Sequence, residues 1–155
     1  MKQCPLFKER MDQIHELIIF FKRYDVRQFT KLSIPDIPAT RWGYVYDTLC
    51  FVFNHINTIN SVLRDDTNQR IEAEKAKHEW FNNGVPPFFK DLYKILTTFK
   101  QLQLFFENEK TLAAHAYPMI AQAAHTLEAL KEQITLESIP ILEVIYNTFV
   151  HDFRE

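Results

Sequence analysis

The side chains most able to do chemistry are twenty acidic residues and six histidines, and the sequence does not group them. Asp65 and Asp66 are adjacent carboxylates, but adjacent acids at the start of a helix usually act as caps and solvated charges. The histidines show no HxxxH or HExxH spacing, which a metal site on one helix would need. We therefore predict no catalytic residues, no metal ligands and no cofactor.

Loops that bind phosphate are not expected either. The motifs GxxxxGK[ST], GxGxxG and GxSxG do not occur, and the chain has only two glycines, Gly43 and Gly84, from which such a loop could be built. The sequence thus predicts no nucleotide chemistry and no small-molecule substrate. A free-standing enzyme has no residues to carry its reaction, so we expect the chain not to be one.

One segment differs in charge from the rest of the chain. Residues 22–41 hold five basic side chains against two acidic ones, a local net charge of +3, whereas the whole chain has a formal charge of −2. The basic residues are Lys22, Arg23, Arg27, Lys31 and Arg41. The segment ends on Arg41 and Trp42, a pair able to hold a phosphate and stack on an unpaired base. The alternative is that Trp42 opens the buried stripe of a helix and Arg41 decorates its first turn.

Helices must position these residues, because the pattern and composition predict an all-α fold. A β-protein of 155 residues would need many more turn residues than two glycines and seven prolines provide. Apolar residues instead recur every three to four positions, as on one face of a helix. We predict five to six helices in a bundle or array, without a β-sheet.

The predicted organisation is a single helical domain over residues 1–155. Its parts are a first helix over 1–24, a basic and proline-containing loop over 25–40, a long helix over 41–64, a polar exposed helix and break over 65–84, and three C-terminal helices over 85–155. The clearest stripe belongs to the helix over 41–64. Among the C-terminal helices, Phe106 and Tyr117 are predicted to lie on buried faces, and the pair Phe105 and Phe106 to pack in the core.

The composition and the N-terminus indicate in which cellular compartment the chain is expected. No stretch reaches the roughly 18 apolar residues that a membrane span requires, and the N-terminus has no apolar region typical of a signal peptide. Cys4 and Cys50 are far apart and show no CxxC spacing, as expected of reduced thiols. We expect an intracellular protein without a membrane partner.

Residues 37–59, IPATRWGYVYDTLCFVFNHINTI, resemble the stretch of hAT-superfamily transposases that contains the motif Thr-Arg-Trp. The preceding FFKRYDVRQF, residues 20–29, is similar to a basic segment of that family. Residues 79–103 look like its Glu-Trp followed by a long helix, and TLAAHAYPMIAQAAHTLEAL is similar to a further helical region. The resemblance spans most of the chain, with the TRW part the most specific.

The resemblance implies that this chain corresponds to the all-helical insertion of the family's RNase H-like domain. Trp42 would then stack on a base flipped out of a DNA end, and Arg41 would contact phosphate. The family's catalytic acidic triad, zinc finger and dimerisation segment have no counterpart here. The chain would be a fragment or a derived protein without catalytic activity, and its implied location is the nucleus, otherwise the cytoplasm.

Two functions follow from these observations. The first is a catalytically incompetent, transposase-derived helical domain that contributes DNA-end or protein contacts. The second is a helical protein–protein interaction or scaffold module, with a protein partner or self-association and no nucleic-acid role, which the net charge of −2 favours. Exposure of the Trp42 indole beside the basic loop would favour the first function.

Overall fold

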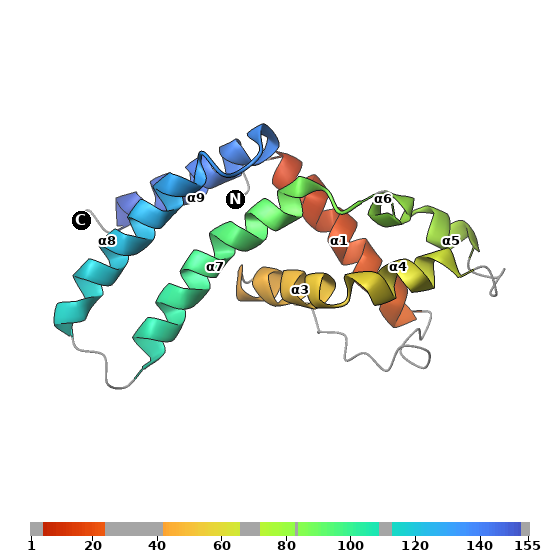
Figure 1. The fold of residues 1–155 in the computed structure, drawn as a ribbon, viewed down its shortest axis with the longest axis horizontal. Helices are drawn as coiled ribbons and strands as arrows, with labels where there is room; N and C mark the ends of the chain where they lie inside the picture. The colour runs from red at the N-terminus through yellow and green to blue at the C-terminus, as the bar shows by residue number, and fades with distance from the viewer. Residues whose placement is uncertain (1–4, 24–41, 66–71, 83, 109–112, 153–155) are drawn as a thin grey trace. The chain divides into compact units, whose positions relative to one another are not determined.

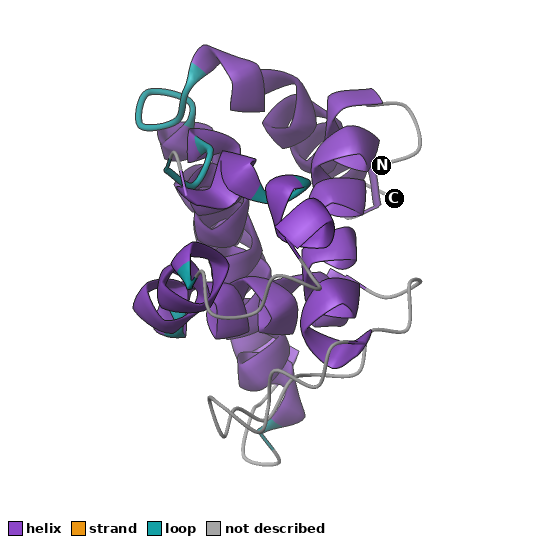
Figure 2. Ribbon diagram, turned by 90° about the vertical axis from the view of Figure 1, so that its right-hand side faces the viewer, coloured by secondary structure: helices purple, strands orange, loops and turns teal. Residues whose placement is uncertain are grey.

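The computed structural model describes residues 5–23, 42–65, 72–82, 84–108 and 113–152, and within them the chain is helical without a strand (Figure 2). The predicted all-α class is confirmed. The helices are α1 (Pro5–Arg23), α3 (Trp42–Asn54), α4 (Ile56–Arg64), α5 (Glu72–Ala76), α6 (Glu79–Asn82), α7 (Pro87–Glu107), α8 (Ala113–Leu130) and α9 (Ile139–Asp152), with a 3-10 turn η2 (Leu136–Ser138) before α9. These described helices number eight because two predicted helices are each interrupted.

Contacts between residues divide the chain into two compact units. Residues 8–86 form one, here called the N-terminal unit, and residues 87–155 with 1–7 form the other, the C-terminal unit. The single domain over residues 1–155 stays a prediction.

Helix α1 follows the predicted apolar stripe. It begins at Pro5, where a proline loses no helical hydrogen bond, and Ile14, Leu17, Ile18 and Phe21 are all buried. Each such side chain contributes roughly 1.5–3 kcal/mol by leaving water. The spacing of the stripe therefore fixes which face of α1 the N-terminal unit covers.

The helix predicted over 41–64 is interrupted at His55, where α3 ends and α4 begins. The carbonyl oxygen of Phe51 accepts two hydrogen bonds from His55, one from the backbone N–H at 3.1 Å and one from Nδ1 at 2.8 Å. His55 itself has φ −120° and ψ 20°, outside the helical region, and this residue interrupts the helix. Ile59 still donates to the His55 carbonyl at 2.9 Å, so helical hydrogen bonding resumes directly after His55.

The segment 65–84, predicted as a polar exposed helix anchored at its end, is exposed only in part in the described residues, where Glu72, Lys77 and Glu79 are exposed. Two short helices, α5 and α6, lie there instead, and Lys75, His78 and Phe81 between and on them are buried. Lys75 tolerates burial because its ammonium pairs with the Glu72 carboxylate at 2.6 Å and donates to the Asp65 carbonyl. These contacts with Glu72 and Asp65 allow a charged side chain to be buried. The spacing of apolar residues in the sequence does not predict such contacts.

In the C-terminal unit, α7 and α8 form an antiparallel hairpin and α9 returns along α8 (Figure 1). This agrees with the three helices predicted over 85–155. Their facing sides bury one apolar core, which includes Phe88, Phe89, Leu92, Ile95, Leu96, Leu102, Ala123, Leu127, Leu130, Ile141 and Leu142.

Two aromatic residues of this hairpin are not where the stripes place them. Phe106, near the end of α7, is 46% exposed, and Tyr117, near the start of α8, is 78% exposed. Both predictions of burial are wrong. The spacing of a stripe says which side chains share a helix face but not how far along the helix a neighbour covers that face.

The start of η2 and α9 is attached to α7 by a buried carboxylate. Asp91 Oδ2 accepts hydrogen bonds from the Thr135 backbone N–H at 3.0 Å, from the Thr135 hydroxyl at 2.8 Å and from the Ser138 hydroxyl at 2.7 Å. A carboxylate at this place satisfies N–H groups that have no partner within their own helix. Asp91 therefore caps, from another helix, the element 44 residues downstream.

Candidate nucleic-acid interface

The predicted basic residues are only partly within the described chain. Lys22 and Arg23 form the last turn of α1, Lys22 half-buried and Arg23 exposed. Basic side chains there also interact favourably with the negative end of the helix dipole. Arg27, Lys31 and Arg41 lie outside the described residues. The structure therefore brings together Lys22 and Arg23 and does not test the rest of the set.

Trp42 is the first residue of α3, so the TRW motif leads directly into a helix N-terminus. The side chain of Trp42 lies outside the described residues, and the choice between stacking and packing stays a prediction. The first turn of α3 contains no acidic residue. Because backbone N–H groups at a helix start have no carbonyl partners and carry partial positive charge, this terminus favours an anion.

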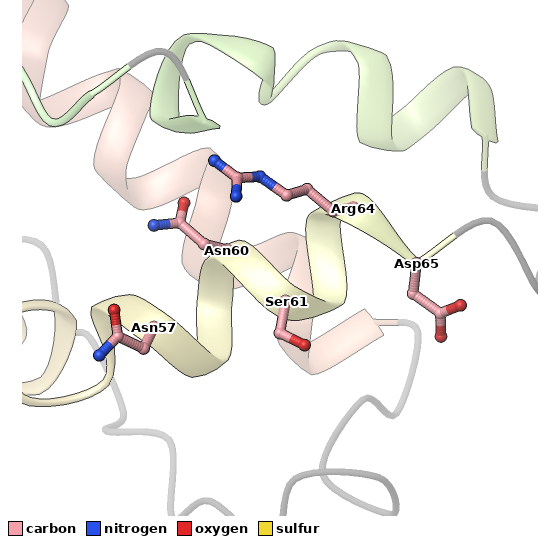
Figure 3. A pocket seen from close by; sticks show the side chains of 5 residues that line it. All are labelled: Asn57, Asn60, Ser61, Arg64 and Asp65. Carbon is pink, nitrogen blue, oxygen red and sulfur yellow. The ribbon is translucent and has the colours of Figure 1, made fainter.

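A second polar surface lies on α4 and was not predicted. Asn57, Asn60, Ser61 and Arg64 occur at spacings of 3, 1 and 3, so they share one side of the helix. With Asp65 they line a surface hollow of about 540 Å³ (Figure 3). In Figure 3 the side chains of Asn60 and Arg64 extend to the same side of α4, whereas those of Ser61 and Asp65 point away from them. We call Asn57, Asn60, Ser61 and Arg64 the α4 polar face.

The α4 polar face has unused hydrogen-bonding capacity. Asn60 Oδ1 is buried without a hydrogen-bond partner. Arg64 is exposed and forms no ion pair or hydrogen bond with another residue in the described part of the chain. Buried polar atoms are normally paired, and an unpaired one costs roughly 1–3 kcal/mol. The groups of this face that reach solvent are therefore the Asn57 amide, the Ser61 hydroxyl and the Arg64 guanidinium, whereas Asn60 Oδ1 does not.

The sequence contained a signal for this face that the apolar stripe of residues 42–63 obscured. Asn and Ser are poorer helix formers than Ala, Glu or Lys, the residues that usually fill exposed helix positions. Asn57 and Ser61 nevertheless occupy exposed positions of α4. Residues that oppose local helix preference often mark functional sites.

Other polar groups in the described residues have structural roles. Asp91, Thr135 and Ser138 form a carboxylate–hydroxyl cluster, but the hydroxyls donate to the carboxylate and no histidine or lysine is present to act as a base. No group of three or more His, Cys, Asp or Glu side chains in the described ranges is arranged to hold a metal ion.

The structure indicates a clear change in pKa for His78. Burial lowers the pKa of His78 below its ordinary value of 6.5, opposed by the nearby Glu16 and Glu74 carboxylates and reinforced by Lys77. Its ring lies 5.1 Å from that of Phe20, and its Nδ1 has no hydrogen-bond partner. A neutral imidazole buried against an aromatic ring is a core residue rather than a site for acid–base catalysis.

None of the described helices has the length and apolar character to cross a membrane. Comparison with protein-family models, curated proteins and solved structures finds no match for this chain. The resemblance to hAT transposases therefore stays a prediction.

Proposed function

We propose that the chain is a catalytically incompetent, transposase-derived helical domain that contacts DNA ends. The observation that carries the proposal is the position of Trp42 as the first residue of α3, directly after Arg41. A phosphate held by Arg41 would also meet the unpaired N–H groups of the helix start. The Trp42 indole would stack on an unpaired base next to that phosphate.

The charge around the motif supports the same proposal. The first turn of α3 holds no acid that would repel a phosphate, and Lys22, Arg23, Arg27 and Lys31 precede the motif in a stretch with a net charge of +3. A local patch of this kind can attract phosphate although the whole chain is slightly acidic, since charges more than about 8 Å apart are largely screened at physiological salt. The proposed DNA role also implies a nuclear location.

A binding experiment with Trp42→Ala tests the stacking role. Hairpin-tipped and single-stranded oligonucleotides are titrated with wild type and variant, and circular dichroism checks that both proteins are folded. Loss of one stacked base should weaken binding by about tenfold or more. Equal affinity of the two proteins would refute the stacking role.

Tryptophan fluorescence gives a second readout in the same system. The chain has two tryptophans, so Trp80→Phe leaves Trp42 as the only indole and serves as the matched control. Stacking on a base should quench the fluorescence of this variant when a hairpin-tipped oligonucleotide is added. Undiminished fluorescence at saturation would contradict the proposed contact.

A second candidate function, a protein-interaction module, is favoured by exposed apolar side chains on the α7–α8 hairpin. Leu104 is 55% exposed, and Phe106 and Tyr117 are also exposed where α7 ends and α8 begins. Exposed apolar patches commonly mark protein interfaces, including those of self-association.

Sedimentation of wild type and of Leu104→Ser/Tyr117→Ser tests the self-association form, because the variant should shift an oligomer toward the monomer. A monomeric wild type at high concentration would exclude self-association.

A further inference from the structure

Residues 72–82 form a short segment of the N-terminal unit, here called the strap, which consists of α5, a turn and α6. The two helices have five and four residues, whereas an isolated helix needs roughly 12–15 residues to be even marginally stable in water. The strap therefore keeps its structure through contacts with the rest of the unit.

Buried side chains attach the strap to its neighbours. Lys75 donates to the Asp65 carbonyl at the end of α4, and Phe81 is buried in α6, which packs on α4. His78 lies in the turn between α5 and α6, and the centre of its ring is 5.1 Å from that of Phe20 on α1. His78 is therefore the contact between strap and α1 that a proton can change.

The surroundings of His78 suit the neutral ring and not the charged one. His78 is 4% exposed, and its Nδ1 atom is buried without a hydrogen-bond partner. In a neutral imidazole one ring nitrogen carries no proton, whereas both nitrogens of an imidazolium are N–H donors. Protonation would therefore bury a charge and leave an N–H donor at a position where the structure gives it no acceptor.

Charged groups around His78 come from α1 and from the strap itself. Burial lowers the pKa of His78, while the carboxylates of Glu16 on α1 and Glu74 on α5 act in the opposite direction and Lys77 in the turn adds to the decrease. The charged side chain of α4 is Arg64, which is exposed and is not among the groups that act on His78. Because Glu16 is exposed and Glu74 half-buried, an imidazolium would meet both carboxylates near the surface.

We propose that protonation of His78 releases the strap from α1, so that the N-terminal unit contains an acid-sensitive device. Release lets the imidazolium reach water and the two carboxylates, and it uncovers the buried rings of Phe20 and Phe81. The strap should be closed above pH 6.5, the ordinary pKa of histidine, and should open increasingly below it. This opening is local to the strap and does not depend on DNA binding.

Native-state hydrogen exchange of wild type at pH 7.5 and pH 5.5 tests the release, with rates corrected for the effect of pH on intrinsic amide exchange. Opening linked to one proton should lower the protection factors of the strap amides by up to about tenfold between these two conditions. Amides of α7 in the other unit should keep their protection and serve as the internal reference. Strap protection that is independent of pH, or that falls together with that of the buried part of α1, would overturn the proposal.

His78→Phe removes the proton acceptor and keeps an aromatic ring against Phe20. The strap of this variant should be equally protected at both pH values, and His78→Gln gives the same expectation with a smaller side chain. His125→Phe is the matched control, because His125 is an exposed histidine of α8 in the other unit, and it should show the wild-type loss of protection. A wild-type loss of strap protection in both His78 variants would overturn the proposal.

Trp80 gives a second readout because it lies in α6, half-buried, with its ring 5.7 Å from that of Phe81. Trp42→Phe leaves Trp80 as the only tryptophan. Lowering the pH from 7.5 to 5.5 should shift its emission to longer wavelength, because release exposes the indole to water, and the shift should be absent from Trp42→Phe/His78→Phe. No shift, or a shift of equal size in both proteins, would contradict release by His78.

Discussion

Asp91 shows how much one buried side chain can organise in the C-terminal unit. Its Oδ2 accepts three hydrogen bonds from Thr135 and Ser138, while the residue itself is only 5% exposed. A buried carboxylate is tolerated when donors surround it, and here the donors belong to the start of another helix. The hydrogen bonds therefore attach α7 to the segment that leads into α9.

Asp91→Ala should lower the free energy of unfolding by about 1–3 kcal/mol, since it removes the acceptor of the buried Ser138 hydroxyl and of the Thr135 N–H and hydroxyl. Urea denaturation of wild type and variant measures the difference. Glu132→Ala is the matched control because it removes an exposed acid from the same unit, and it should change stability by less than about 0.5 kcal/mol. Equal stabilities of Asp91→Ala and wild type would show that water replaces the carboxylate.

His78 makes the stability of the N-terminal unit depend on pH. Its pKa is lowered in the folded protein, so below pH 6.5 the unfolded chain binds a proton more readily than the folded one. The His78 contribution to stability should thus be complete above pH 6.5 and be lost as the pH falls toward the lower folded pKa.

Urea denaturation between pH 8 and pH 5 tests this for wild type and His78→Phe. Phenylalanine keeps the contact with Phe20 and cannot be protonated, and the other histidines titrate in both proteins. The difference in stability between the two proteins should therefore shift in favour of the variant as the pH is lowered. A difference that is constant across this range would contradict the prediction.

At the scale of the element, single residues decide where helices bend. His55 places a side-chain donor on the Phe51 carbonyl and separates α3 from α4. Pro118 lies inside α8, as its sixth residue, where it has no N–H to donate to the carbonyl four residues earlier. Gly84 has a φ of 108° in the connection between α6 and α7, a conformation that residues with a Cβ rarely adopt.

Pro118→Ala should stabilise the C-terminal unit by about 1–3 kcal/mol, because it restores the hydrogen bond to the Ala114 carbonyl and relieves the clash of the proline ring. The proline is exposed, so little packing is lost. A higher midpoint of urea denaturation and a stronger helical circular dichroism signal would agree with the prediction. A destabilised variant would mean that the packing of α8 on its neighbours requires the bend.

The chain passes between the two compact units twice, within α1 after Phe7 and between α6 and α7 after Pro86. Residues 87–155 make up most of the C-terminal unit, and the Asp91 hydrogen bonds stay within them. A fragment of residues 87–155 should therefore fold as a helical unit without residues 1–7. Its amide NMR spectrum should be well dispersed and overlap that of the same residues in the full chain, whereas a collapsed, poorly dispersed spectrum would contradict independent folding.

Much of this fold was predictable because it depends on local spacing. The apolar stripe of α1 and its start at Pro5 are visible in the sequence and are found in the structure, as are the three helices after residue 85. Scarce glycine and a helical period exclude a sheet without any knowledge of tertiary contacts. The sequence by itself therefore determined the all-α class and most of the helix positions.

The tertiary structure decided what depends on partners distant in sequence. Lys75 and His78 are buried in a segment whose sequence predicts exposure. Phe106 and Tyr117 are exposed, although the apolar spacing of their helices predicts burial. Burial is a property of two surfaces that meet, so the spacing on one helix cannot specify it. For the same reason only the tertiary structure shows that Asn57, Ser61 and Arg64 are exposed on α4 while the Asn60 Oδ1 atom is buried.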